Sequence, residues 1–542
     1  MSPVKLNSKY LTNIPQKTLF EYADELSVRV PTSCKRNGEC HECIVEVSKG
    51  NEKLSKSTEH ETFLRGNYRL ACQAQVIDDK SEIHFNVLKR QPKILTDSIN
   101  LEFKLNPSFI RDNNEVKMNS NGKFISVDKY NGNILGLAVD IGTTTIVINL
   151  VNLENGNIIH TTSFENPQRF GGSDIMNRIS YDTGKFSGEL KSVLISSINF
   201  EIKEMVKNLK IRRTNIYEIV VVGNTTMRDI FLGYDVETIG VKPYKSITEF
   251  KQIKNEIPHT AVTEKSKDLG LRINKNGVVY AAPLISSHLG SDISADLLTI
   301  DFESINDPFL LVDIGTNTEV VLGYEGKYLA ASCPAGPAFE GAGVTYAMPG
   351  YSGAIEKIEF FPDDKIKYEV IDNKTPIGIC GSGLIDLIAG LLKTGNINEL
   401  GVFKNNDNQF EFSEMNNLTI SRSDLSALAQ AKAANYCGQA IVIQESGIEI
   451  DQINNLFLAG GFANYINIEN AIEIGFIPNV QEKKITKIGN ASLAGATKML
   501  LSIDSRNQLE KITKNIEHIE LETIPTFFDF FVDGCQFKKM EI

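Results

Sequence analysis

Residues Leu137–Val151, LAVDIGTTTIVINLV, contain a pattern that recurs almost unchanged at Leu310–Leu322, LLVDIGTNTEVVL. Each copy consists of an apolar strand, an Asp-Ile-Gly-Thr turn and a second strand rich in β-branched residues. A turn containing glycine follows each copy, at residues 154–156 and 324–326, and leads into a third strand. The repeat therefore predicts two related β-sheet halves that face a shared cleft.

The two Asp-Ile-Gly-Thr turns have the composition of phosphate-binding loops. Their glycines let the backbone approach a phosphate closely, the nearby N–H and hydroxyl groups can donate to its oxygens, and the aspartates can hold Mg²⁺ through its waters. A hairpin corner is the structural alternative for one such turn, but two turns in register favour binding. The predicted residues are Gly142, Thr143, Thr144, Thr145, Gly315, Thr316, Asn317 and Thr318 for binding, with Asp140 and Asp313 as the catalytic pair that positions Mg²⁺ and the hydrolytic water.

Two further glycine-containing segments extend the predicted site. Residues 456–464, LFLAGGFAN, form an apolar strand that ends in a Gly pair suited to pack against a flat adenine and ribose. Residues 379–384, ICGSGL, open a helix whose N-terminal amides could meet a phosphate or ribose, with close helix packing as an equal alternative. The residues predicted to bind nucleotide here are Gly381, Ser382, Gly383, Gly460 and Gly461. The sequence contains no Walker-type G-x-x-x-x-G-K-[ST] loop.

The motifs DIGTTT, DIGTNTE and LAGGFAN resemble the phosphate-1, phosphate-2 and adenosine motifs of the ATPase superfamily of sugar kinases, heat-shock chaperones and actin. The resemblance implies an α/β fold of two ribonuclease H-like halves, at residues 134–307 and 308–542, with nucleotide between them. It does not settle what the ATP is used for.

Four of the eight cysteines fall within the first 72 residues and have the spacing C-x₅-C-x₂-C, followed by the fourth after 28 intervening residues. A close cluster of this kind in a cytosolic protein indicates metal binding more than disulfides. The spacing resembles the plant-type [2Fe–2S] ferredoxin pattern, with one extra residue in the first gap, and four thiolates are what two iron ions require. The predicted ligands are Cys34, Cys40, Cys43 and Cys72.

Other interpretations of this loop are less favoured. Zinc sites usually have two C-x₂-C pairs, and a Rieske centre needs two histidines, whereas only His41 lies in the loop. We expect His41 to be a solvated loop residue. The remaining cysteines are expected to be small buried side chains: Cys333, Cys380, Cys437 and Cys535.

Composition narrows the function further. The chain has 542 residues, enough for two to four domains, and its net charge of −12 without a Lys/Arg-rich run argues against a nucleic-acid surface. The N-terminus has no apolar signal region, and no uncharged apolar run of membrane-spanning length occurs. A cytoplasmic protein without a membrane segment is expected.

The local patterns predict several elements outside the motifs. Residues 1–92 are expected to form a cluster domain of short strands, and residues 93–133 a polar linker. Asn224 and Thr225 are placed to cap a helix or to line the cleft. The predicted ranges are strands at 18–20, 27–30, 44–47, 74–77 and 83–87, a helix at 188–209, an irregular insertion at 243–277, a helix at 422–445, a helix from about 490, and a terminal strand at 526–537.

The pairing of a ferredoxin-like module with an actin-like ATPase implies that ATP hydrolysis gates or drives an electron. The whole chain resembles the ATP-dependent reductive activators of corrinoid proteins in seven segments: PTSCKRNGECHEC, RLACQ, GLAVDIGTTT, LLVDIGTNTE, CPAGPAFEGAG, GICGSGLID and LAGGFAN. The resemblance implies a β-grasp [2Fe–2S] domain, ATP with Mg²⁺, and reduction of Co(II) to Co(I) for methyl transfer or O-demethylation. It implies a corrinoid partner from a methyltransferase system and an external low-potential electron donor.

Other classes remain open at this point. A small-molecule kinase with an appended redox sensor would use the same cleft, and an electron-transfer protein with a degenerate nucleotide site would keep only the cluster. The intact Asp, Gly and Thr residues of both turns argue against the latter. Activators of acyl-CoA dehydratases use a different cluster. The sequence leaves the oligomeric state open, a homodimer included.

Overall fold

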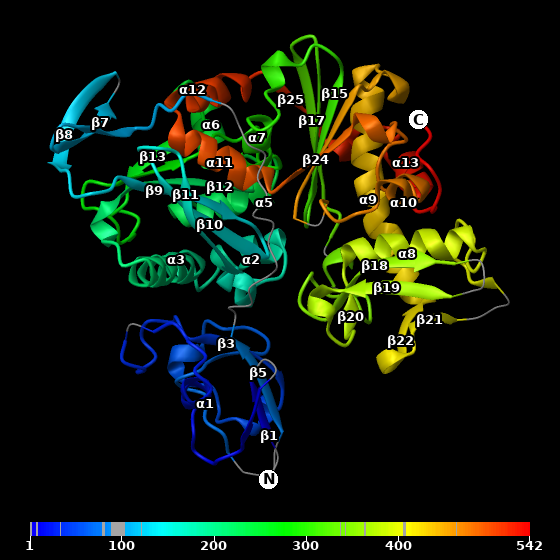
Figure 1. Cartoon of the computed structure of the whole chain (residues 1–542), viewed down its shortest axis with the longest axis horizontal. Coiled ribbons are helices and arrows are strands. Elements are labelled where there is room, and N and C mark those ends of the chain that lie inside the picture. The colour runs from blue at the N-terminus through cyan, green and yellow to red at the C-terminus, as the bar shows by residue number, and fades with distance from the viewer. Residues whose placement is uncertain are drawn as a thin grey trace. The chain divides into compact units, whose positions relative to one another are not determined.

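A computed structural model describes residues 3–542, except 7, 8, 33, 78–81, 88–102, 121, 337, 342, 362–364, 405–407 and 462. The chain forms two compact units, and Figure 1 labels their elements. Unit 1 comprises residues 1–91, 107–258 and 262–281, and unit 2 comprises residues 92–106, 259–261 and 282–542.

The N-terminal part of unit 1 is a five-stranded sheet with the helix α1 (Leu19–Glu25) packed on it. The strand order is β2-β1-β5-β3-β4, in which β1 and β5 are parallel and the other neighbours antiparallel. This is the expected β-grasp arrangement. The strands are β1 (Pro3–Leu6), β2 (Lys9–Thr12), β3 (Ile44–Lys49), β4 (Tyr68–Leu70) and β5 (Ile83–Val87).

Sequence patterns located only part of this domain. The strands predicted at 44–47 and 83–87 are confirmed as β3 and β5, whereas residues 18–20 begin α1, because Thr18 and Glu21 form a capping box that starts a helix. Residues 27–30 lie in no strand, and residues 74–77 make only isolated bridges. Strands β1 and β2 are only four residues long, too short for a recognisable sequence pattern.

The segment predicted to be a linker contains an antiparallel three-stranded sheet of β6 (Phe109–Asp112), β7 (Glu115–Ser120) and β8 (Lys123–Lys129). Among the hydrophobic residues of these strands, only Phe109 and Val116 are buried, so the strands lack the alternating pattern that would reveal them. The Phe109 ring contacts Tyr217, with centroids 5.5 Å apart. Residues 107–133 therefore extend unit 1, whereas residues 93–102 of the predicted linker lie outside the described residues.

A second sheet in unit 1 has the order β11-β10-β9-β12-β14-β13. Strands β9, β10 and β11 are antiparallel neighbours, while β12 and β14 run parallel to β9. The strands are β9 (Leu135–Ile141), β10 (Thr145–Asn152), β11 (Ile158–Glu165), β12 (Ile216–Gly223), β13 (Val262–Lys265) and β14 (Val278–Ala281). The expected irregular insertion at 243–277 thus contributes the edge strand β13, which pairs with β14.

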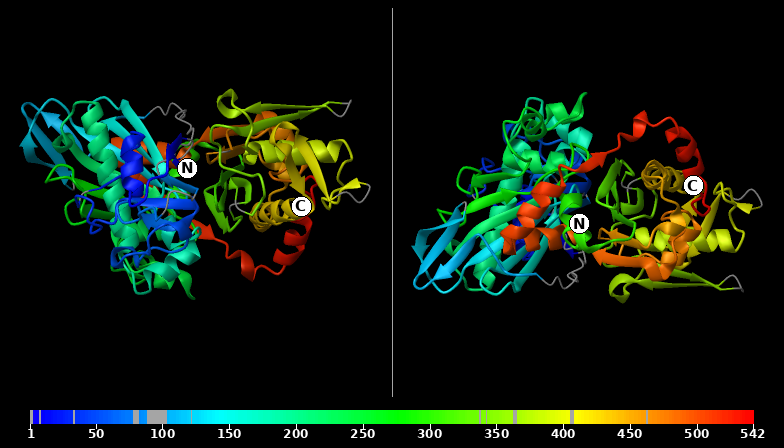
Figure 2. Two further views of the ribbon diagram at one scale, coloured as in Figure 1. Left: turned by 90° about the horizontal axis from the view of Figure 1, so that it is seen from below. Right: turned by 90° about the horizontal axis from the view of Figure 1, so that it is seen from above.

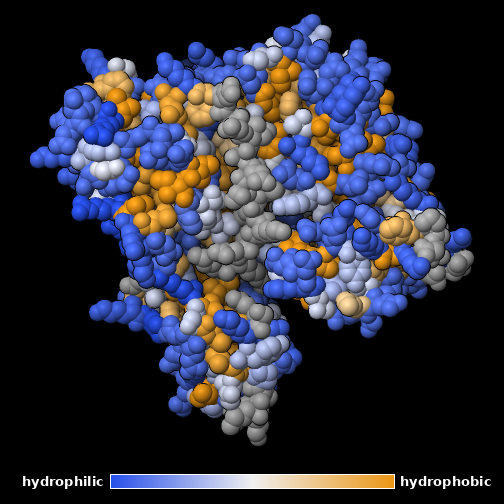
Figure 3. Space-filling view, viewed as in Figure 1, coloured by the Kyte–Doolittle hydropathy of each residue, from blue (hydrophilic) through white to orange (hydrophobic). Residues whose placement is uncertain are grey.

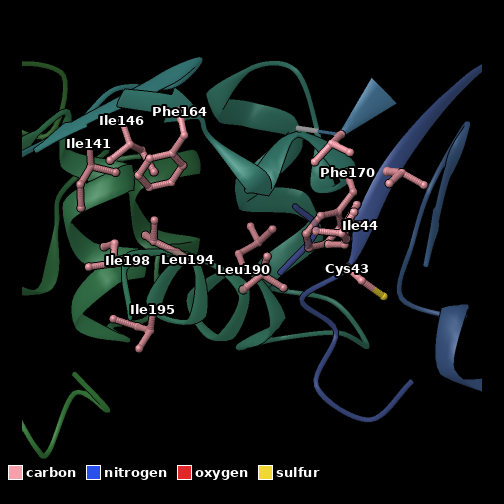
Figure 4. Close-up of a cluster of buried hydrophobic side chains, with 14 of the residues drawn as sticks. Cys43, Ile44, Ile141, Ile146, Phe164, Phe170, Leu190, Leu194, Ile195 and Ile198 are labelled. Carbon is pink, nitrogen blue, oxygen red and sulfur yellow. The ribbon is translucent and has the colours of Figure 1, made fainter. Parts of the chain in front are cut away.

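Helices cover this sheet and connect it to the cluster domain. The predicted helix at 188–209 is confirmed as α3 (Glu189–Asn208), and its Leu194 and Ile198 face Ile146 and the other apolar residues of the sheet in Figure 4. The remaining helices of this part are α2 (Ile175–Asp182), α4 (Thr225–Leu232), α5 (Glu237–Gly240) and α6 (Ile247–Ile253).

Unit 2 repeats the sheet of unit 1. Its strand order is β24-β23-β15-β16-β17-β25, with β15, β16 and β17 antiparallel and β23 and β24 parallel to β15. Both sheets therefore place the motif strand at the same position, and the predicted duplication is confirmed. The strands are β15 (Phe309–Ile314), β16 (Thr318–Tyr324), β17 (Lys327–Cys333), β23 (Asn455–Ala459), β24 (Ile485–Gly489) and β25 (Ile516–His518).

The helix α7 (Ser291–Leu297) belongs to unit 2, although the sequence boundary between the halves was placed at residues 307 and 308. It packs against α11 (Ala491–Leu501) so closely that a Cβ added to Gly495 would lie 2.1 Å from the Ala295 carbonyl oxygen. The last crossing of the chain from unit 1 to unit 2 accordingly lies between Ala281 and Ala282.

The rest of unit 2 surrounds this second sheet. The helices predicted at 422–445 and from 490 are confirmed as α9 (Arg422–Ser446) and α11. The predicted terminal strand is wrong: residues Phe527–Gly534 form the helix α13, whose apolar residues pack on α9, and both views of Figure 2 show the C-terminus beside that helix. The other elements are β18 (Ala354–Phe360), β19 (Ile366–Val370), β20 (Gly378–Ile379), α8 (Gly381–Lys393), β21 (Gln409–Ser413), β22 (Leu418–Ser421), α10 (Ile468–Glu473) and α12 (Ile503–Ile512).

Hydrophilic residues cover most of the face shown in Figure 3, with smaller hydrophobic areas between them. None of the helices in the described ranges is both long and apolar enough to cross a bilayer.

Candidate functional site

The four N-terminal cysteines form two thiol pairs in the cluster domain. The Sγ atoms of Cys43 and Cys72 lie 3.4 Å apart, and the hydrogen bond between them lowers the pKa of Cys72 to about 6 while raising that of Cys43. Burial opposes ionisation of Cys34, but hydrogen bonds from the Cys40 thiol and from three loop N–H groups outweigh it, and its pKa falls to about 7. One thiol in each pair is therefore stabilised as a thiolate.

This arrangement fits a two-iron cluster better than a single metal ion. Within the described ranges, no group of three or more His, Cys, Asp or Glu side chains is placed to hold one ion. A structural zinc ion needs four ligands at one point, whereas a [2Fe–2S] cluster takes two thiolates on each iron. The pairing of Cys34 with Cys40 and of Cys43 with Cys72 matches the second requirement. The other cysteines follow the expectation in part, since three are buried and Cys535 is half-buried.

The loop between the cysteines contacts the first ATPase half. The prediction that His41 is solvated is wrong: its Nδ1 lies 3.0 Å from Oε2 of Glu189, the first residue of α3, and its ring stacks on Phe63 with centroids 4.1 Å apart. The neighbouring Glu42 accepts a 2.6 Å hydrogen bond from Ser196 on α3. The sequence could not reveal these contacts because about 150 residues separate the partners.

Side chains from outside the motif donate hydrogen bonds to the backbone carbonyls of the phosphate-1 turn, which comprises residues 142–145. The Gly142 N–H donates to the Thr145 carbonyl, and a Cβ on Gly142 would lie 2.6 Å from that oxygen, so only glycine fits. Asn166 Nδ2 donates to the Gly142 carbonyl at 2.8 Å, and Arg178 Nη2 donates to the Thr143 carbonyl at 2.6 Å. The carbonyls of the turn are thus engaged inside the protein and do not face an anion.

Asn224 links the turn to α4. Its Oδ1 accepts from the Met227 N–H and caps the helix, as predicted, while its Nδ2 donates to the Thr143 hydroxyl at 3.0 Å. The capping role is therefore confirmed, and the same side chain also contacts the phosphate-1 turn, while lining of the cleft stays a prediction. Asp140 is the last residue but one of β9, two positions before Gly142, and is half-buried.

The phosphate-2 turn in unit 2 is closed by a Gly315 N–H to Asn317 carbonyl hydrogen bond of 2.9 Å. The glycine-rich loop after β17 contacts it, because the Gly336 N–H donates to the Thr316 carbonyl and the Thr316 hydroxyl donates to Glu340. The Thr318 hydroxyl is buried and finds no hydrogen-bond partner among the described residues. A bound ligand would give this group a partner.

Four acidic side chains gather around this turn, and only Asp313 was predicted. Burial raises the pKa of Asp313 to about 7 and that of Asp292 to about 6, with the charge of Asp292 adding to the shift of Asp313. Burial and the neighbouring carboxylates also raise the pKa values of Asp296 and Glu319 well above their usual range. The pKa values rise because the ionised carboxylates would repel one another. A hydrated cation such as Mg²⁺ would offset this repulsion and favour the ionised forms.

The predicted adenosine segment meets the phosphate-2 turn. Gly460 has φ +100°, and a Cβ there would lie 2.2 Å from the Ile314 carbonyl oxygen and 3.0 Å from Asp313 Oδ1. A Cβ on Gly461 would meet nothing within 4 Å, so this glycine borders open space. The structure thus brings Gly460 and Asp313 together, while nucleotide binding by Gly460 and Gly461 stays a prediction.

The segment Gly381–Gly383 lies at the start of α8, against β18. A Cβ on Gly383 would lie 2.6 Å from the Ile355 carbonyl oxygen, and the Ser382 hydroxyl donates to the Glu356 carbonyl at 2.8 Å. These contacts explain both residues by close packing, which was the alternative interpretation. Nucleotide binding by Gly381, Ser382 and Gly383 stays a prediction.

Comparisons with protein-family models match three parts of the chain. Residues 6–76 match the 2Fe-2S iron-sulfur cluster binding domain, residues 135–304 the RACo middle region, and residues 307–542 the C-terminal domain of RACo, the ASKHA domain. Together the matches include the cysteine loop and both phosphate turns.

Individual relatives agree with the family models. The chain is 32% identical over 441 residues to the corrinoid activation enzyme RamQ of Eubacterium limosum, covering 76% of this chain and 72% of that protein. It is 25% identical to the [Co(II) methylated amine-specific corrinoid protein] reductase of Methanosarcina barkeri, covering 73% and 76%. The solved structure of a reductive activator for corrinoid, iron-sulfur protein superposes with a TM-score of 0.72 at 27% identity, covering 100% of this chain and 99% of that one.

Proposed function

The chain belongs to the family of reductive activators of corrinoid proteins, and on this basis we propose that it uses ATP to drive an electron from a [2Fe–2S] cluster to a corrinoid protein, reducing Co(II) to Co(I). The observation that supports this proposal is the presence of two thiol pairs and two phosphate turns in one chain. Neither a kinase nor a simple ferredoxin would need both.

We propose Cys34, Cys40, Cys43 and Cys72 as the cluster ligands. When bound, the cluster would supply a one-electron relay at about −400 mV, the range of plant-type ferredoxins. Cys43 and Cys72 are buried, whereas Cys34 and Cys40 are partly exposed. The Cys34 and Cys40 side of the loop is therefore the edge where electrons would enter or leave.

The nucleotide would be bound by residues of both turns. The Gly142 and Gly315 turns offer close backbone approach to phosphate, and the acidic group around Asp313 would attract Mg²⁺ through water. Asp140 and Asp313 would orient the attacking water, since each is the last residue but one of the motif strand of its sheet. Gly461, beside open space, is the proposed surface for the adenosine.

An energetic reason connects the two activities. The family resemblance implies that Co(II)/Co(I) has a lower potential than the cluster, and each 59 mV of such a one-electron gap lowers the equilibrium constant about tenfold. Hydrolysis linked to a change between two protein states can offset a gap of roughly 100–200 mV. ATP would be required because the uphill electron is otherwise not delivered.

We further propose an external low-potential donor for the cluster and a partner from a methyltransferase system that serves methyl transfer or O-demethylation. The cytoplasm, where thiols stay reduced, is the proposed compartment.

The test is anaerobic reduction of a corrinoid protein followed by the absorbance of Co(I). The prereduced activator should accumulate Co(I) with MgATP, and a non-hydrolysable analogue should support docking without sustained turnover. Equal Co(I) formation with and without nucleotide would contradict the proposal.

A further inference from the structure

The short helix α2 contacts both the phosphate-1 turn and the cluster domain. Asp174 caps its N-terminus by accepting from the Asn177 N–H, and the helix carries Arg178 and Tyr181. Neither residue belongs to any motif used above. Arg178 contacts the phosphate-1 turn, and Tyr181 contacts the cluster domain.

Arg178 supports the turn. Its side chain is fully buried, and its guanidinium donates to the Thr143 carbonyl at 2.6 Å and to the Gly172 carbonyl at 3.1 Å. Burial lowers its pKa to about 9, so it remains charged at neutral pH. Among the described residues it forms no ion pair, although a buried cation ordinarily has an anionic partner. An anionic phosphate on the turn would compensate this charge.

Tyr181 supports the cluster domain. Its side chain is fully buried, and its hydroxyl donates to the Phe63 carbonyl at 2.6 Å. The Phe63 ring stacks on His41, which lies in the loop between Cys40 and Cys43. One hydrogen bond and one ring contact therefore connect α2 to the loop that carries the proposed ligands Cys40 and Cys43.

A second connection follows the same direction. The 3₁₀ turn Pro167–Gly171 is preceded by Asn166, which binds the Gly142 carbonyl, and it carries Phe170. The Phe170 ring packs edge-on against Phe63 at 5.3 Å and against Tyr181 at 5.5 Å. Figure 4 shows Phe170 beside Ile44 and Leu190, in the apolar contact between the two domains.

We propose that α2 transmits the state of the phosphate-1 turn to the cluster loop, with Arg178 and Tyr181 as positioning residues. The proposal rests on the proposed function, because it states how nucleotide and electron are connected. A phosphate that moves the Thr143 carbonyl also moves the rigid guanidinium bonded to it. The movement passes along α2 to Tyr181, whose hydroxyl donates to the Phe63 carbonyl. A shift of Phe63 then moves the ring that stacks on His41. Close-packed contacts of this kind change between discrete arrangements.

The first test is Tyr181→Phe, which removes one hydroxyl and no ring. We expect iron content and ATP hydrolysis to stay within about twofold of the native values, and ATP-dependent Co(I) formation to fall roughly tenfold, within the usual range of coupling between sites. The matched control is Tyr217→Phe, which removes another buried tyrosine hydroxyl of unit 1, bonded to Asp128 at 3.3 Å. The control should leave both activities unchanged. Parallel loss of hydrolysis and Co(I) formation in Tyr181→Phe would overturn the proposal.

A second measurement needs no corrinoid partner. Hydrogen exchange of residues 59–72 should slow when MgADP or a non-hydrolysable ATP analogue binds the native protein, and Tyr181→Phe should abolish this response while leaving nucleotide affinity unchanged. Arg178→Lys keeps the charge but loses the two-carbonyl fork, so it should weaken both nucleotide binding and the response. An unchanged exchange response in Tyr181→Phe would refute the inference. Failure of the native protein to reduce cobalt, with this response intact, would refute only the proposed function.

Discussion

The Sγ atoms of Cys43 and Cys72 lie 3.4 Å apart, although the two cysteines are 29 positions apart in the chain. The short strand β4 ends at Leu70, and its pairing with β3 brings the fourth thiol beside the third. The pair exists because of the sheet, and the cluster should therefore depend on each of its members.

Replacing Cys72 by Ala should remove most of the iron, because each thiolate fills one coordination position. Iron analysis and visible absorbance of the anaerobically purified protein measure the loss. The same change at Cys34, Cys40 or Cys43 should behave alike, whereas Cys437→Ala, at a buried cysteine of α9, should leave the spectrum unchanged. Full cluster content in Cys72→Ala would refute the ligand assignment.

Asp313→Asn should lower ATPase turnover by roughly 10² or more, because it keeps the shape of the side chain but removes the charge that orients Mg²⁺ and water. Asp140→Asn should do the same. Phosphate release measures the rate, and the absorbance of the cluster should stay intact. The exposed Asp451 offers a matched Asp→Asn control with native turnover. Undiminished hydrolysis in both motif variants would mean that the repeat is structural.

Gly460→Ala and Gly461→Ala should separate backbone fit from ligand contact. A Cβ at Gly460 collides with the Ile314 carbonyl at 2.2 Å and requires an unfavourable φ of +100°, so thermal stability should fall by several degrees. The added methyl at Gly461 enters open space, so stability should stay native while nucleotide affinity weakens. Calorimetry and nucleotide titration give the two quantities. Native affinity in Gly461→Ala would remove this residue from the proposed adenosine surface.

The stability of unit 2 should rise as pH increases from about 7 to 9. Burial lowers the pKa of Lys432 to about 7, and its Nζ donates to the Ile474 carbonyl at 2.9 Å and the Gln536 carbonyl at 2.6 Å. Between this pKa and the ordinary value near 10.5, the unfolded chain binds a proton that the folded chain does not, and the free energy of unfolding therefore increases with pH.

Denaturant unfolding at several pH values measures this slope, which is at most about 1.4 kcal/mol per pH unit for one group. Lys432→Met should remove the slope, whereas Lys511→Met, at an exposed position of α12, should retain it. A slope that survives in Lys432→Met would assign the effect to other groups.

Sequence patterns predicted the elements that combine strong periodicity with a motif. The DIGT repeat located β9, β10, β15 and β16, and the resemblance to ferredoxins gave the β-grasp fold of the first domain. Amphipathic or Ala-rich stretches located α3 and α9. In these segments local preference and tertiary packing agree.

The rest depended on contacts between distant residues. The sequence TFFDFFVDG reads as a strand because it is apolar on every side, yet packing on α9 makes it the helix α13. Asp292 and Asp296 carry no motif, and only the fold places them near Asp313. No sequence motif marked Arg178 as a neighbour of the phosphate-1 turn. A Glu at position 319 within DIGTNTE was the one available signal for the acidic group.

The position of α7 has a practical consequence for dividing this protein. A cut at the boundary that the motifs suggest, between residues 307 and 308, would leave Asp292 and Asp296 on one fragment and the phosphate-2 turn on the other. It would also strip α11 of the neighbour on which Gly495 is closely fitted. The boundary suggested by the motifs therefore lies one helix, α7, beyond the start of the compact unit that holds the site. A fragment intended to bind nucleotide through its second turn should begin no later than Ala282.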